Sequence, residues 1–322
     1  ELDGETVLAM VEGILDEDQK TIFHDTGNID LAYQVPGADR FRVNIFRQRA
    51  EISLAARRVT RDIPNFEALR VPETLGNVLT HHQGLILLAG PTGSGKSTTI
   101  ASMLEQINQT RRCHILTLED PIEYVYTDKK AFINQREIGI DTPDFPSALR
   151  AMLREDPDVI LLGEMRDPET FEAALQAAET GHLVFGTIHA STAPQTISRI
   201  TELFPIERRS QILQTLAFTL QAIICQKLLP SCQEDISRVP CLEIMLNNSV
   251  VRDLIEQGRE GDLASVIRSS ELDGMLSFNS SLIQLIETDI IDPKTAYAVS
   301  PNADELRMRL KGINTGAGGL IG

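Results

Sequence analysis

The sequence contains no tryptophan, and aromatic residues of all kinds make up only 5% of its 322 positions. Its four cysteines include no C-x-x-C pair, so neither a zinc ribbon nor a disulfide framework is predicted. The longest apolar stretches, at 85–89 and 217–225, fall far short of the roughly 20 residues that a membrane-spanning helix needs. We therefore expect no transmembrane segment. Cysteines that are few and without a pattern also suit the reducing environment of the cytosol.

Basic residues are also in deficit, because 30 lysines and arginines face 46 aspartates and glutamates, a formal net charge of −16. An excess of negative charge disfavours proteins that bind the phosphate backbone of nucleic acids, so no nucleic-acid partner is expected. The hydrophobic content of 42% is ample for the core of one large or two ordinary domains.

Residues 1–70 are predicted to form a small α+β unit. Apolar residues at helical spacing predict a helix over 6–16. Strands are expected at 29–35, 40–46 and 51–59, the first two joined by a Pro36-Gly37 turn. A connector over 61–73 follows, and we place the boundary between domains in a linker at 71–76.

From residue 77 onward, apolar strands alternate with helices, a pattern typical of a largely parallel α/β sheet. The strands are expected at 85–89, 115–118, 159–162 and 183–187, and the helices at 97–107, 146–154 and 168–180. After residue 206 the chain is expected to be mostly helical, and a glycine-rich tail occupies 315–322. The second domain would thus span 77–322, with a C-terminal helical region from about residue 248.

One glycine-rich segment fits the pattern G-x-x-x-x-G-K-S and stands between a predicted strand and a predicted helix. That context favours a phosphate-binding loop over a plain turn, because backbone N–H groups and the helix N-terminus attract phosphate. Lys96 can reach the β- and γ-phosphates of ATP, and the Ser97 hydroxyl can ligate Mg²⁺. The predicted nucleotide-binding residues are Gly90, Pro91, Thr92, Gly93, Ser94, Gly95, Lys96, Ser97 and Thr98.

Carboxylates follow two of the predicted strands. Glu119 and Glu123 come just past 115–118, whereas Glu164 follows 159–162, with Gly163 at the usual Walker B aspartate position. Ligands of open α/β sheets bind beyond the carboxyl ends of the strands, where clustered acids suit Mg²⁺ and an attacking water. We predict Glu164 and Glu119 as Mg²⁺ ligands, directly or through water, beside Ser97. The alternative is that these acids are solvated loop residues.

Two histidines bracket the last predicted strand of the sheet. His189 ends it and could hydrogen-bond the γ-phosphate, whereas His182 precedes it, and a purely structural role is the alternative for both. Arginines alone, without lysine, crowd residues 40–61: Arg40, Arg42, Arg47, Arg49, Arg57, Arg58 and Arg61. The simple interpretation is an exposed hairpin face. Planar bidentate donors also suit phosphate charge supplied in trans, if the protein is a ring.

Four segments taken together resemble a known family: GPTGSGKS, ILTLEDPIEY, ILLGEMRD and TGHLVFGTIHAST, in this order. They are similar to the type II/IV secretion ATPase superfamily and, within it, to the PilT/PilU-like retraction ATPases of type IV pili. The resemblance extends from about residue 8 to residue 310. It implies a RecA-like P-loop ATPase core behind a PAS-like N-terminal domain that lacks its first strands.

The resemblance also implies a cytoplasmic homohexamer at the inner-membrane base of the pilus. Its expected partners are a platform protein in that membrane and a paralogous retraction ATPase. By matching position, Glu119–Glu123 form the aspartate box and His182 and His189 the histidine box. Arg42 and Arg57 would act in trans, with Arg58 as the alternative to Arg57. Glu123 would activate water, and Glu164 would handle Mg²⁺.

Two details favour retraction over pilus extension or type II secretion. The segment 227–235 continues without the four-cysteine module common in those ATPases, and 250–257 partly matches a retraction signature. An ordinary amphipathic helix explains 250–257 equally well. An extension or secretion ATPase, an accessory PilU-like ring, and a P-loop kinase or nucleic-acid ATPase remain the alternatives.

Overall fold

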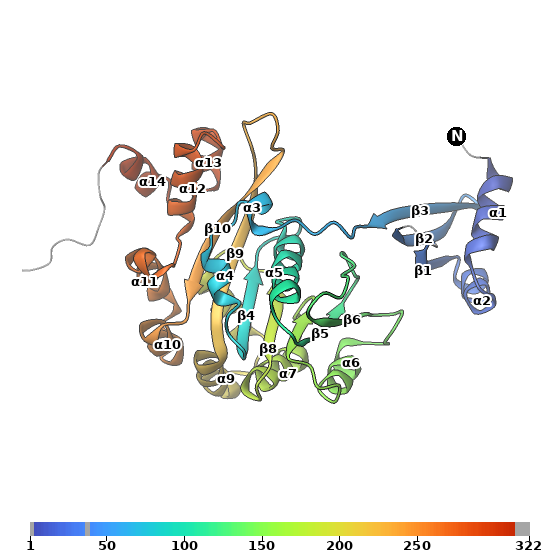
Figure 1. Cartoon of the computed structure of the whole chain (residues 1–322), viewed down its shortest axis with the longest axis horizontal. Coiled ribbons are helices and arrows are strands. Elements are labelled where there is room, and N and C mark those ends of the chain that lie inside the picture. The colour runs from blue at the N-terminus through green and yellow to red at the C-terminus, as the bar shows by residue number, and fades with distance from the viewer. Residues whose placement is uncertain (1–2, 36–38, 313–322) are drawn as a thin grey trace, which may run out of the picture.

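The computed structural model describes residues 3–35 and 39–312, which form a three-stranded sheet and a seven-stranded sheet. The predicted Pro36-Gly37 turn and the tail at 315–322 lie outside the described residues. In Figure 1 an extended connector joins the small N-terminal part to the large sheet, and the C-terminal helices lie at the opposite side. Within the described ranges, no helix has the length and apolarity required to span a membrane.

The N-terminal part confirms the predicted α+β unit. Its antiparallel sheet consists of β1 (Asn28–Gln34), β2 (Arg40–Gln48) and β3 (Glu51–Val59), and the expected first helix is α1 (Gly4–Ile14). A second helix, α2 (Glu17–Thr26), was not predicted, because its sequence is polar and its buried residue is Phe23 alone among those described. A capping box between Asp16 and Gln19 fixes where α2 begins.

The connector contains a short helix, α3 (Phe66–Leu69), and leads to α4 (Thr74–Val78). It is tied to the large part early, because the Val125 N–H donates to the carbonyl of Thr60 at 3.1 Å. The segment 61–73, predicted to be a connector without secondary structure, contains the one helical turn of α3.

The large sheet has the strand order β10-β9-β4-β8-β7-β5-β6. Five of its strands pair in parallel with one another: β4 (Gly84–Ala89), β5 (His114–Glu119), β6 (Phe132–Glu137), β7 (Val159–Leu162) and β8 (Leu183–Ile188). The prediction of a largely parallel α/β sheet is confirmed. β6 was missed because its sequence, FINQRE, has no sustained apolar pattern.

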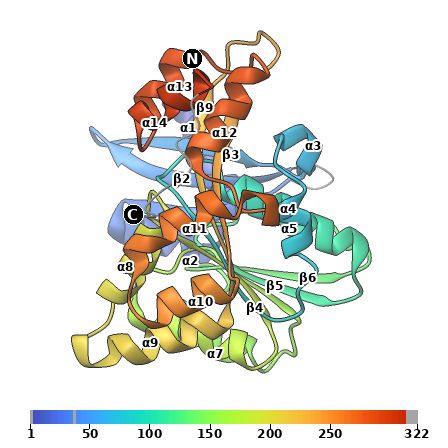
Figure 2. The same ribbon diagram turned by 90° about the vertical axis from the view of Figure 1, so that its left-hand side faces the viewer.

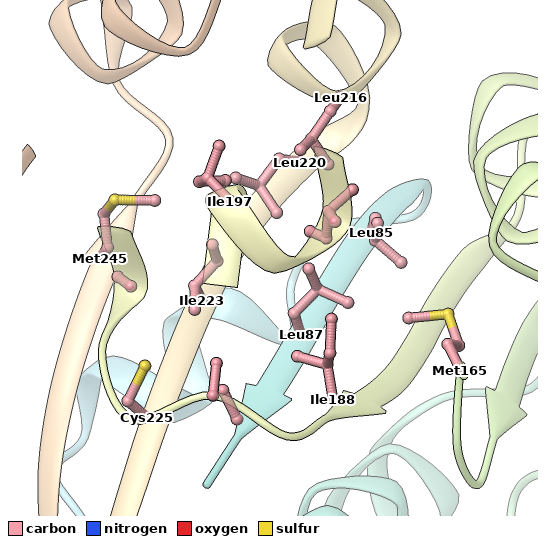
Figure 3. Packing of buried hydrophobic residues seen from close by; sticks show 14 of the residues in the cluster. Leu85, Leu87, Met165, Ile188, Ile197, Leu216, Leu220, Ile223, Cys225 and Met245 are labelled. Atoms are coloured by element: carbon pink, nitrogen blue, oxygen red, sulfur yellow. The ribbon is translucent and has the colours of Figure 1, made fainter. Parts of the chain in front are cut away.

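Helices cover both faces of this sheet: α5 (Lys96–Thr110), α6 (Phe145–Met152), α7 (Pro168–Glu179), α8 (Ala193–Glu202) and α9 (Ile206–Thr219). Alternate side chains of β4 enter two separate apolar clusters. Leu85 and Leu87 join one cluster, part of which is shown in Figure 3, and Ile86 and Leu88 join the other. The central strands are thus buried on both sides, as parallel sheets require.

The expectation of a mostly helical chain after residue 206 is wrong for residues 220–246. This stretch forms β9 (Leu220–Pro230), parallel to β4, and β10 (Arg238–Leu246), antiparallel to β9. Because both faces of β9 are covered, its apolar run shows no alternation, and such a run cannot be distinguished from a buried helix by periodicity.

The helical C-terminal region expected from about residue 248 is confirmed. It comprises α10 (Ser249–Glu256), α11 (Leu263–Ser269), α12 (Phe278–Glu287), α13 (Pro293–Val299) and α14 (Ala303–Leu310), grouped along the β9–β10 side in Figure 2. In α10, which covers the signature-like segment, Val251, Leu254 and Ile255 are buried, the pattern of an amphipathic helix.

Candidate active site

A cavity of about 460 Å³ opens where the parallel strands of the large sheet end. Its walls come from the glycine-rich loop after β4 and from the segments that follow β5, β7 and β8. The cavity brings together most of the predicted site residues: Thr92, Gly93, Ser94, Gly95, Lys96, Ser97, Thr98, Glu119, Glu123, Glu164 and His189. The carboxyl ends of parallel strands are where open α/β sheets bind ligands.

The ammonium group of Lys96 is folded back onto its own loop. Its Nζ donates to the carbonyl oxygens of Gly90 at 2.8 Å and Pro91 at 3.1 Å. Burial lowers the pKa of Lys96, and the charges of Glu164 and Glu123 oppose that shift. The loop carbonyls therefore hold the positive charge at a place where phosphate oxygens could replace them.

Glu164 is held by two cationic or ionisable neighbours. Arg166 approaches both carboxylate oxygens at 2.5 Å, and His189 Nε2 lies 3.0 Å from Oε1. Partial burial raises the pKa of Glu164, but Arg166 and His189 outweigh it, and the net shift is downward. Glu164 is therefore an anion at neutral pH, and it links the segment after β7 to the end of β8.

The glycine in place of the Walker B aspartate has a steric reason. A Cβ added to Gly163 would lie 3.2 Å from both the Cα of Glu119 and the carbonyl oxygen of Leu118. The end of β7 thus approaches the end of β5 so closely that a side chain at this position would have to displace the neighbouring backbone by a few tenths of an ångström. The next residue along the chain, Glu164, carries the carboxylate that lines the cavity.

Glu119 lies deeper in the site than the other acids. It accepts hydrogen bonds at Oε1 from Thr117 Oγ1 at 2.7 Å and from Gln135 Nε2 at 3.2 Å. Burial raises the pKa of Glu119 to about 7, against these hydrogen bonds. Glu123, by contrast, is exposed at the cavity wall, so the two aspartate-box glutamates occupy different environments.

His182 lies at the opposite end of β8 from His189. Its Nδ1 is 2.9 Å from the carbonyl oxygen of Ala177 and 3.3 Å from Thr180 Oγ1, at the end of α7. The structure therefore separates the two histidines that the sequence pattern groups together, and the contacts of His182 are those of a helix cap.

Arg42 and Arg57 are directly opposite each other in the β2–β3 register, on the face of the small sheet opposite Val43 and the helices. Both line a second cavity of about 660 Å³ that also includes Glu137 and Asp120. Asp120 lines the first cavity as well, so the two cavities adjoin. Like charges that face each other across strands destabilise a sheet unless an anion offsets them, and Glu137 supplies negative charge near Arg42 within this cavity.

Three other arginines of the cluster contact residues of this chain. Arg58 Nη1 donates to Asp39 at 3.2 Å, and Arg40 pairs with the buried carboxylate of Glu137 at 2.9 Å. Arg47 stacks over the ring of Phe23, 5.5 Å from its centroid. Because Arg57 and Arg58 are adjacent, they point to opposite faces of β3, and it is Arg57 that shares a face with Arg42.

Sequence reasoning missed several residues of the site. Tyr124 lines the cavity and its hydroxyl lies 2.9 Å from Thr98 Oγ1, while Arg166 holds Glu164. Their position inside the conspicuous motifs was the available signal. Gln226 supports the loop from β9, and nothing in its local sequence indicated this contact.

Within the described residues, no group of three or more His, Cys, Asp or Glu side chains forms a metal site by itself. Mg²⁺ in nucleotide sites is usually bound through one or two protein carboxylates together with substrate phosphates. Ser97, Glu164 and Glu119 all line the same cavity, so the donors for such an ion are present.

The parallel sheet, with a glycine-rich loop at the carboxyl end of β4, is typical of α/β proteins that bind nucleotides. Comparison with known proteins identifies the family. The chain belongs to the family described as type II/IV secretion system protein, whose model matches residues 38–288.

Two curated relatives and one solved structure resemble nearly the whole chain. It is 40% identical to a twitching motility protein of Neisseria gonorrhoeae over 95% of this chain and 82% of the relative. It is 41% identical to the type IV pilus retraction ATPase PilT of Pseudomonas aeruginosa, over 92% of this chain and 85% of that protein. The crystal structure of the pilus retraction motor PilT with bound ADP superposes with a TM-score of 0.87 at 44% identity, covering 93% of this chain and 85% of that one.

Proposed function

We propose that this protein is an ATP-hydrolysing motor that retracts type IV pilus filaments and thereby drives twitching motility. The observation that carries the proposal is one cavity that combines the Lys96 loop with Glu123, Glu164 and His189. The similarity to PilT over nearly the whole chain supports the assignment to retraction.

The loop from Gly90 to Thr98 would bind the phosphates of ATP. Its backbone N–H groups lie at the N-terminus of α5, a helix of 15 residues whose dipole favours negative charge there. Lys96 would exchange the carbonyls of Gly90 and Pro91 for the β- and γ-phosphate oxygens. Mg²⁺, held by Ser97 and by Glu164 and Glu119 directly or through water, would offset the charge of the phosphates.

Glu123 is the proposed general base: it is an exposed carboxylate on the cavity wall, as Asp120 also is, and the family resemblance assigns the activation of water to Glu123. His189 would hydrogen-bond the γ-phosphate. Because its Nε2 lies 3.0 Å from Glu164, it would also couple the binding of the γ-phosphate to Glu164. Phosphoryl transfer depends mainly on positioning and charge neutralisation, which these groups supply. His182 would act only indirectly, through the end of α7.

Arg42 and Arg57 would complete the site in trans. We propose that the N-terminal domain, residues 1–70 with a PAS-like fold, swings relative to the ATPase domain. The movement would occur before α3, because Val71 and Leu75 of the predicted 71–76 linker are buried in the core of the large part. The movement would place this arginine pair over the nucleotide of the neighbouring subunit, which requires a ring, proposed to be a homohexamer. Release after hydrolysis in the 77–322 ATPase domain would reopen the interface and do mechanical work.

The motor would act in the cytoplasm, peripherally at the inner membrane, against the pilus platform protein. A paralogous retraction ATPase is the proposed additional partner. Because loss of a retraction motor lets filaments accumulate, deletion of the gene should give hyperpiliated cells that do not twitch. Bald cells would identify an extension motor instead.

The enzymatic test is steady-state phosphate release by the purified protein. Wild type should hydrolyse ATP, and Lys96→Ala should abolish hydrolysis, because the charge on the β- and γ-phosphates is no longer offset. Lys130→Ala, which removes an exposed lysine outside the cavity, is the matched control and should behave as wild type. A wild type that binds ATP without hydrolysing it would overturn the motor and indicate an accessory ring.

A further inference from the structure

The register of β9 places one of its glutamines beside the glycine-rich loop. β4 ends at Ala89, which pairs with Cys225, so the residues that follow on the two strands are Gly90 and Gln226. From Gln226 onward, β9 continues beyond the end of β4 with β10 as its strand partner. The side chain of Gln226 is only 3% exposed, so its amide needs partners inside the protein.

Both ends of that amide contact the proposed phosphate-binding segment. Nε2 donates to the carbonyl oxygen of Ser94 at 2.8 Å, and Oε1 accepts from Thr99 Oγ1 at 2.8 Å. The Gln226 side chain therefore connects the glycine-rich loop, at Ser94, to the first turn of α5, at Thr99. The loop is shaped to admit it, because a Cβ at Gly95 would lie 2.7 Å from Nε2.

The next residue of β9 faces the C-terminal helices. Lys227 Nζ donates to the carbonyl oxygen of Val299 at 2.8 Å and lies 4.4 Å from the centroid of the Phe278 ring. Consecutive residues on a strand point to opposite sides, so β9 contacts the loop with one residue and α12 and α13 with the next.

We propose that Gln226 is a positioning residue that holds the glycine-rich loop in its phosphate-binding shape. This proposal rests on the nucleotide site proposed above. Without the amide, the Ser94 carbonyl and the Thr99 hydroxyl lose a buried partner, and the loop gains alternative conformations in which its N–H groups no longer converge. Phosphate affinity falls, whereas the reacting groups of the site, Glu123 and Glu164, stay in place.

The test is titration of the full-length protein with fluorescent ADP, together with steady-state ATP hydrolysis. Gln226→Met keeps the side-chain length but removes both hydrogen bonds, and it should weaken ADP binding and raise KM about tenfold, with kcat changed less than about threefold. The matched control is Gln221→Met, because Gln221 lies on the same strand but donates to the Gln83 carbonyl, before β4. This control should bind ADP as wild type does.

A second variant separates positioning from simple loss of stability. Thr99→Val removes one of the two hydrogen bonds and should weaken ADP binding about threefold. In the Gln226→Met background it should add nothing, since the shared bond is already lost. Affinity and KM within twofold of wild type in Gln226→Met, or equal losses in Gln221→Met, would overturn the proposal. A wild type that does not bind ADP would instead overturn the nucleotide site itself.

Discussion

The two sheets of this protein differ in how much of their surface is covered. The seven-stranded sheet is buried between two apolar clusters, whereas the three-stranded sheet has one apolar cluster, centred on Val43 and Ile45. Its other face carries Arg42 and Arg57. The covered sheet is suited to hold the loop and the acids in fixed positions, and the half-covered sheet is suited to present charge to something else.

Polar contacts join the small N-terminal part to the large part. The Arg40–Glu137 ion pair and the hydrogen bond from Val125 to Thr60 join them, beside a cavity lined by both. Interfaces of this kind are compatible with relative domain motion. We therefore propose that the large sheet carries the chemistry and that the small sheet is the part that moves.

The largest effect is expected from the acids of the covered sheet. Glu123→Gln should lower the rate of ATP hydrolysis by about 10² to 10⁴-fold, because the amide cannot accept a proton from water. ADP affinity should stay within about threefold of wild type. Glu179→Gln, an exposed acid at the end of α7, is the control. Hydrolysis by Glu123→Gln at near wild-type rate would remove it as the base.

The next largest effect is expected at the face of the three-stranded sheet that carries Arg42 and Arg57. Arg57→Ala should reduce hydrolysis about hundredfold or more, since it removes a donor to developing phosphate charge. It should not lower Tm, because the substitution also relieves repulsion with Arg42. Arg58→Ala, which loses the ion pair with Asp39, should retain activity. Equal losses in the two variants would contradict the assignment of faces.

A smaller effect should show how closely the strands of the covered sheet approach. Gly163→Ala should destabilise the large part by about 1–3 kcal/mol, because the new methyl group meets the backbone of Glu119 and Leu118. Gly13→Ala in α1 meets no atom within 4 Å and should stabilise slightly. Thermal unfolding of both variants measures this difference. An unchanged Tm in Gly163→Ala would refute the steric explanation of the atypical Walker B position.

The smallest effect is a pH dependence in the covered sheet. Burial raises the pKa of Glu243 above 4.5, although the Ala193 N–H that donates to it and the charge of Lys227 oppose the shift. The folded state then binds the proton more tightly than the unfolded state. The resulting stability is full below about pH 4.5 and is lost as pH rises through the folded pKa.

The neutral variant Glu243→Gln does not titrate. The Tm of wild type should therefore fall relative to that of the variant as pH rises from about 4 to 8. A difference that stays constant over this range would show that the carboxyl group has no raised pKa.

Much of the fold was predictable, because β4 and β7 are short apolar runs and each is followed by a motif with a recognisable spacing. β6 and the β9–β10 hairpin were not, since one lacks an apolar pattern and the other is apolar without alternation. Of the site, the loop and Glu164 follow from motifs. The shared face of Arg42 and Arg57 could not be predicted, because it depends on the register of β2 and β3. The contacts of Gln226 could not be predicted either, because they join residues more than 120 positions apart.

We propose that Arg42 and Arg57, on the three-stranded sheet of one subunit, complete the nucleotide site on the seven-stranded sheet of another subunit. The direct test mixes Arg57→Ala with Lys96→Ala, each inactive alone, and measures ATP hydrolysis. Activity should return in the mixture, because an Arg57 from the Lys96→Ala subunit can reach an intact loop in the Arg57→Ala subunit. A mixture as inactive as its two components would show that the arginine does not act in trans.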